Sequence, residues 1–117
     1  MIRKDNCGCV IERKYASDYL LKRFYQGSKG REICKASIDG SRSFTLYLSK
    51  EGILSYKASE CPILIITLEA LCEAFEEHKG NVNRESLVSK VKSIKGFQFN
   101  TLSEKITELF LECLKVI

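Results

Sequence analysis

The sequence predicts an α+β protein in which an N-terminal helix precedes a three-stranded antiparallel meander, and three helices follow it. Two patterns carry this prediction. Residues 43–49 alternate apolar and polar side chains, which is typical of a half-buried strand. From residue 62 onward, apolar residues recur at the spacing of one helix face, interrupted at Gly80 and Gly96. At this length, we expect residues 1–117 to form a single domain with its own core.

The N-terminal part is expected to hold a short strand and one helix. Residues 9–15 (CVIERKY) are predicted to form the strand. Ser17 is a favourable N-cap, Asp18 suits the positive end of the helix dipole, and Gly27 is a typical stop signal. These signals predict a helix over residues 18–26.

Three segments separated by turn signals predict the meander, and they span residues 31–39, 43–49 and 53–59. The first turn signal is Asp39-Gly40-Ser41, and the second is KEG at 50–52. In the middle segment, SFTLYLS, the apolar side chains Phe44, Leu46 and Leu48 fall on one face.

Three helices are predicted in the C-terminal half. The first begins between Pro62 and Leu68. The second is capped by Asn83 and ends at Gly96. The motif TLSE at 101–104 is a capping box that starts a helix running to the C-terminus. Four glutamates are expected on the side of the first helix opposite its apolar stripe: Glu69, Glu73, Glu76 and Glu77.

The two halves of the chain carry opposite net charge. Residues 1–59, the basic half, hold 12 Lys and Arg against 6 Asp and Glu. Residues 60–117, the helical half, hold 7 against 9. A positive half attracts anions such as nucleic-acid phosphates. The alternative is that the lysines only keep a small protein soluble.

No segment predicts a membrane span or a secretory signal. The apolar, uncharged run CPILIITL at 61–68 is far shorter than the roughly 20 apolar residues that a span needs. The basic N-terminus is not followed by the apolar run of a signal peptide. We therefore expect a cytoplasmic protein without a membrane partner, in which the six cysteines are reduced thiols.

The cysteines do not match the spacing of a zinc site. Cys7 and Cys9 are one residue apart, whereas zinc ligands usually come as two pairs with longer spacing. Cys72 and Cys113 lie on apolar helix stripes and are expected in the core. The alternative metal-binding set is Cys7, Cys9, Cys34 and Cys61. We expect no bound metal and no other cofactor.

Catalytic motifs are not recognisable either. The single histidine, His78, stands at a predicted helix end, where it complements the helix dipole. The segment QGSKGR at 26–31 lacks the spacing of a phosphate-binding P-loop. We expect that the protein is not an enzyme.

A basic and aromatic segment, residues 13–31, predicts contact with nucleic acid. Its cations can hold phosphates, and its tyrosines can stack on unpaired bases. The alternative is that these rings only pack the helix against the sheet. The second C-terminal helix adds two lysines, whereas the last helix, which would be the recognition helix of a trihelical unit, exposes glutamates that repel phosphate. The candidate nucleic-acid-binding residues are Arg13, Lys14, Tyr15, Lys22, Arg23, Lys29, Arg31, Lys90 and Lys92.

One leucine lies outside the apolar stripe of the last helix. Leu111 points away from that stripe, and Leu114 with residues 116–117 makes the last turns apolar nearly all round. Apolar surface on both sides of a terminal helix favours a second chain that covers one side. We predict a homodimer that pairs through Leu111 and Leu114. The alternative is that another part of the same chain, such as the N-terminal segment, covers Leu111.

The function favoured by the sequence is therefore that of a small cytoplasmic nucleic-acid-binding protein, with a regulatory role, that contacts phosphates through its basic half. The acidic helices favour the alternative, a protein-interaction module or inhibitor without a nucleic-acid partner.

Overall fold

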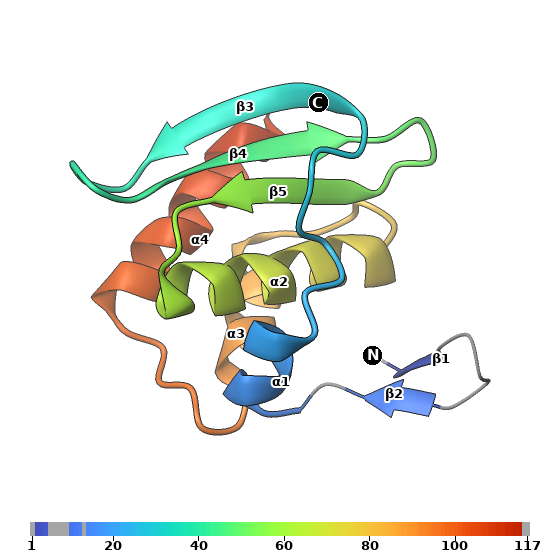
Figure 1. Cartoon of the computed structure of the whole chain (residues 1–117), viewed down its shortest axis with the longest axis vertical. Coiled ribbons are helices and arrows are strands. Elements are labelled where there is room, and N and C mark those ends of the chain that lie inside the picture. The colour runs from blue at the N-terminus through green and yellow to red at the C-terminus, as the bar shows by residue number, and fades with distance from the viewer. Residues whose placement is uncertain (1, 5–9, 13, 116–117) are drawn as a thin grey trace.

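The predicted α+β fold is confirmed by the computed structural model, which describes residues 2–4, 10–12 and 14–115. A three-stranded sheet is covered on one face by helices (Figure 1). Helices α2 and α4 pack directly against the sheet, and α1 and α3 pack against α2. The elements in chain order are β1 (Ile2–Lys4), β2 (Val10–Glu12), α1 (Ala16–Leu21), β3 (Arg31–Ser37), β4 (Ser43–Leu48), β5 (Leu54–Ala58), α2 (Pro62–Glu77), α3 (Arg84–Lys92) and α4 (Thr101–Leu114).

The N-terminal strand belongs to a small hairpin. Strand β2 occupies the middle of the predicted strand 9–15 and pairs antiparallel with β1, which the sequence did not predict. This hairpin lies apart from the three-stranded sheet (Figure 1).

Helix α1 begins and ends earlier than predicted. Its N-cap is Tyr15 rather than Ser17, and the Asp18 carboxylate accepts the N–H of Tyr15 at 3.1 Å. The helix ends at Leu21 because the following N–H groups find other partners. The N–H groups of Phe24 and Tyr25 donate to the carboxylate of Glu69 on α2, at 2.9 Å and 3.2 Å. A tertiary contact thus replaces the predicted last turn of the helix.

The meander follows the predicted order, with β4 between β3 and β5. Phe44 and Leu46 are buried against the helices, as the alternating pattern predicted. The first turn is held by Asp39, whose Oδ1 accepts the N–H groups of Ser41 and Arg42 at 2.9 Å each. These donors, led by the Ser41 N–H, lower the pKa of Asp39 to about 2. Residues 25–27 add hydrogen bonds along the free edge of β5.

The helix boundaries in the C-terminal half shift by a few residues. Asn83 caps α3 as predicted, with its side chain accepting from the Ser86 N–H at 2.8 Å, but α3 ends at Lys92 instead of Gly96. Helix α4 is capped by Asn100 rather than Thr101, and its Oδ1 accepts from the Ser103 N–H at 3.0 Å. Asparagine is the stronger N-cap of the two, which explains the shift by one residue.

Within the described residues, no helix is both long enough and apolar enough to span a membrane.

Helix α2 is more deeply buried than predicted. Residues 64–75 are all buried, because the sheet, α1, α3 and α4 surround the helix. The predicted polar side is therefore wrong for Glu69 and Glu73, which are completely buried, although Glu77 is exposed as expected.

A disulfide joins the sheet to the last helix. Cys34 on β3 and Cys113 in the last turn of α4 are bonded, with Cα atoms 5.5 Å apart. The expectation that all six cysteines are thiols is wrong for this pair, although Cys113 is buried as predicted. The two residues are 79 positions apart, and only the packing of α4 on β3 brings them together.

Candidate nucleic-acid interface

The predicted basic segment lies against the end of α3. The Lys95 N–H donates to the Lys14 carbonyl, and the Ala16 N–H donates to the Lys95 carbonyl, both at 2.8 Å. Tyr15 and Lys95 thereby form a short parallel bridge. This bridge adds Lys95, which the sequence had not singled out, to the predicted Lys14 and Tyr15.

Two aromatic rings in this region each carry a lysine ammonium. The Lys95 Nζ lies over the Tyr15 ring, 5.8 Å from its centre, and the Lys92 Nζ lies over the Phe99 ring at 5.5 Å. Both distances fall within the range of a cation–π contact. Phe99 is half-buried and packs against the core, whereas the Tyr15 ring is largely exposed. We call these five residues the basic–aromatic patch: Lys14, Tyr15, Lys92, Lys95 and Phe99.

The charge of the patch is only partly neutralised by its neighbours. Within the described part of the chain, no carboxylate lies within ion-pair distance of Lys92 or Lys95. Asp18 lies next to the N-terminal segment, since its carboxylate accepts the N–H groups of both Lys14 and Tyr15. Lys92 at the end of α3 and Lys95 after it therefore supply positive charge that carboxylates of the described residues do not cancel.

Comparison of the chain with models of protein families, with curated proteins and with solved structures finds no match.

The other predicted contact residues are not gathered in the patch. Arg23 donates to the carboxylate of Glu60 at 2.8 Å, and this hydrogen bond raises the pKa of Arg23. Lys22 is 4.0 Å from Asp18. Lys29 and Arg31 belong to the connection into β3 and to its first residue. Arg13 lies outside the described residues.

The side chain of Lys90 is mostly buried and paired with carboxylates, so its ammonium is not available at the protein surface. Its Nζ lies 2.5 Å from the Glu73 carboxylate and 2.9 Å from that of Glu77, and only 14% of its side chain is exposed. The Tyr19 hydroxyl also donates to Glu73, at 3.0 Å. This arrangement leaves Lys90 little freedom to reach a phosphate, so we do not include it in the patch.

A row of carboxylates on α2 organises the segment between α1 and β3. Glu69 receives two backbone N–H groups of this segment, and Glu76 accepts the hydroxyl of Tyr25. Burial, together with the Glu69 carboxylate, raises the pKa of Tyr56 above its ordinary value, so that hydroxyl keeps its proton. The sequence predicted this row of glutamates but not its partners, because those partners are distant in the chain.

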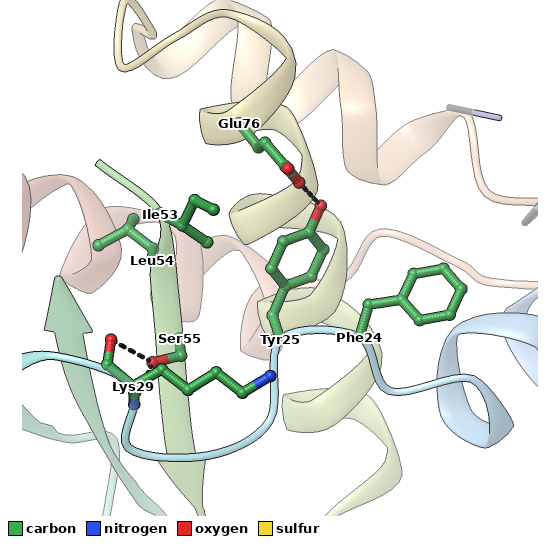
Figure 2. A pocket seen from close by; sticks show the side chains of 7 residues that line it. All are labelled: Phe24, Tyr25, Lys29, Ile53, Leu54, Ser55 and Glu76. Carbon is green, nitrogen blue, oxygen red and sulfur yellow. Dashed lines mark hydrogen bonds between the residues drawn. The ribbon is translucent and has the colours of Figure 1, made fainter. Parts of the chain in front are cut away.

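A small hollow lies beside this row, between the same segment and β5. Its volume is about 170 Å³, and Figure 2 shows Tyr25, Lys29 and Glu76 around it. The polar groups at its wall bind one another: the Tyr25 hydroxyl donates to Glu76, and the Ser55 hydroxyl donates to the Lys29 carbonyl at 3.5 Å (Figure 2). The Lys29 N–H also donates to the Ser55 hydroxyl, at 3.0 Å.

The cysteines in the described residues do not converge on a metal. Cys34 is bonded to Cys113, so it cannot complete the alternative set with Cys61 while the disulfide is intact. Cys7 and Cys9 lie outside the described residues. Among the residues that are described, no three His, Cys, Asp or Glu side chains come together in a geometry that could hold a metal ion.

Leu111 and Leu114 are both half-buried and pack against the core. They line a shallow groove of about 440 Å³ between α4 and residues 80–84. Part of the same chain thus lies beside Leu111, and among the described residues it is the connection before α3. The homodimer stays a prediction.

If the homodimer forms through this groove, the wild-type chain is expected to sediment as a dimer at high micromolar concentration, and Leu111→Glu as a monomer. A charge buried at an interface costs too much to be tolerated there. Ile53→Glu is the matched control, since Ile53 is exposed in the turn before β5 and its substitution should leave assembly unchanged. A monomeric wild type would refute the dimer.

Proposed function

We propose that this protein binds nucleic acid through the basic–aromatic patch. The observation that carries the proposal is the pairing of Lys95 with Tyr15 and of Lys92 with Phe99, on two chain segments that are hydrogen-bonded side by side. A non-catalytic role, as expected from the sequence, belongs to the same proposal.

The physical basis is the release of counterions from phosphates. A lysine that contacts a phosphate displaces condensed cations, and the gain in their entropy drives binding at low salt. Lys92 and Lys95 suit this role because no carboxylate of the described residues pairs with them. Phe99 and Tyr15 hold the lysine stems beside apolar surface and keep the ammonium groups at the protein surface.

The rival function is a protein-interaction module. Leu21, with 80% of its surface exposed, supports it, since a large apolar side chain is more often exposed where a partner covers it. A single exposed leucine is also common on monomeric proteins. Leu21 therefore supports the protein-interaction module less strongly than the basic–aromatic patch supports nucleic-acid binding.

Replacing Lys92 and Lys95 together with Ala should weaken binding to nucleic acid and reduce its salt dependence. Each lost phosphate contact removes about 0.7 to 0.9 from the slope of log affinity against log salt, so the slope should flatten by about 1.5. The measurement is fluorescence anisotropy with labelled oligonucleotides from low to physiological salt.

The matched control is the double variant Lys50→Ala, Lys57→Ala, which removes two exposed lysines from the sheet side of the molecule. Its salt slope should equal that of the wild type. Equal slopes for the two double variants, or a wild type that binds no oligonucleotide at low salt, would refute the proposed function and leave the protein-interaction module as the better explanation.

A further inference from the structure

The Tyr15 ring is unusually open for an aromatic side chain of this protein. It has 53% of its surface exposed, while Tyr19, Tyr25 and Tyr56 are buried. Lys95 lies over the ring, and the backbone of Tyr15 is fixed by its bridge to Lys95 and by Asp18. An exposed ring on a fixed backbone is a surface on which a flat partner can stack at small cost in conformational entropy.

The helices next to the patch are poorly suited to enter a groove of duplex DNA. A recognition helix contacts bases through its N-terminal residues. In α3 that turn carries Glu85, and the Arg84 guanidinium is held by Glu108. The outer side of α4 carries Glu104, Glu108 and Glu112, whose charges repel phosphates. The cations of the patch lie instead on the segment before α1 and at and after the end of α3.

We infer that the ligand of the basic–aromatic patch is single-stranded nucleic acid, with a base stacked on Tyr15 and neighbouring phosphates on Lys92 and Lys95. This inference rests on the proposed function. In a duplex the faces of the bases are covered by their neighbours, so an exposed tyrosine gains nothing there. An unpaired base can stack on the side of the ring that Lys95 does not cover, and the Lys95 ammonium over the other side meets the adjoining phosphate.

The test compares three labelled ligands of the same sequence at low salt: a single-stranded DNA of 12 nucleotides, the matching RNA strand and the DNA duplex. We expect the wild type to bind each single strand at least tenfold more tightly than the duplex. Tyr15→Ala should weaken binding to the single strands by about tenfold, which is within the range for losing one stacked base, and leave duplex binding unchanged.

Two further variants separate stacking from other effects. Tyr15→Phe keeps the ring and should keep the affinity, whereas Tyr15→Leu keeps apolar bulk and should behave like Tyr15→Ala. Tyr47→Ala is the matched control, because it removes a half-buried tyrosine from β4 on the face opposite Phe44 and Leu46. Its affinity for the single strands should equal that of the wild type, and circular dichroism verifies that each variant is folded.

The outcomes distinguish this inference from the proposed function. Binding of either single strand with the expected dependence on Tyr15 supports both. Binding that prefers the duplex, or that weakens in the Lys92→Ala, Lys95→Ala variant but not in Tyr15→Ala, overturns the inference and leaves the proposed function in place. A wild type that binds none of the three ligands overturns both.

Discussion

Replacing Lys90 with Met is expected to lower the free energy of unfolding by about 3 kcal/mol, because it removes a cation that pairs with a buried carboxylate. Glu73 is completely buried on α2, and the Lys90 ammonium lies 2.5 Å from its Oε1. Methionine preserves most of the volume of the lysine stem, so the loss reports the charge pair rather than a cavity. Chemical denaturation in urea measures the change.

Lys92→Met is the matched control for this prediction. Lys92 stands two residues along the same helix, is exposed and contacts the Phe99 ring. Its replacement should change the free energy of unfolding by less than about 1 kcal/mol. The double variant Lys90→Met, Glu73→Met removes both buried charges and should recover much of the loss. A Lys90→Met variant as stable as Lys92→Met would contradict the assignment of Lys90 to a structural pair.

Reduction of the disulfide is expected to have an effect of similar size. The bond between Cys34 and Cys113 closes a segment with a sequence separation of 79. For a loop of this length, the loss of chain entropy in the unfolded state is worth about 4 kcal/mol. The wild type should therefore unfold at a clearly lower urea concentration in the presence of a phosphine reductant than without it.

Two variants control for other thiols. The double variant Cys34→Ala, Cys113→Ala should unfold at the same urea concentration with and without reductant, whereas Cys61→Ala should stay sensitive, because Cys61 is a free thiol. A reductant effect that persists in the double variant would place the stabilising bond elsewhere. Peptide mapping of the unreduced protein should recover the 34–113 pair directly.

The elements could be predicted from local patterns, but the burial of α2 could not. The alternation of apolar and polar residues in β4 and the capping residues of the helices are local patterns, so they can be recognised in the sequence. The same local patterns place Glu69 and Glu73 on the polar side of the helix, opposite its apolar stripe. They are buried because Tyr19, Lys90 and the backbone of Phe24 and Tyr25 meet them in the folded protein. Those partners lie 17 to 54 positions away, so no local pattern reveals them.

The candidate interface was predicted in part. Lys14 and Tyr15 were singled out by the mixture of cations and aromatic residues in 13–31, and Lys92 as a cation of the second C-terminal helix. The structure brings them together with Lys95 and Phe99. Lys95 was missed because it stood in the predicted last turn of a helix that in fact ends at Lys92. The signal that could have found it was the run of lysines at 90, 92 and 95 before Gly96.

Under the proposed function, the bridge between Tyr15 and Lys95 would also determine when the protein becomes able to bind its ligand. It joins residues that are 80 positions apart, so its formation has to overcome the closure entropy of most of the chain. A nascent chain that has not yet released residue 95 from the ribosome carries Tyr15 without its lysine partner. A ligand that contacts both segments would therefore bind completed molecules and not fragments. At ligand concentrations well above the dissociation constant, it would stabilise the native state by an amount that grows with the logarithm of the ligand concentration.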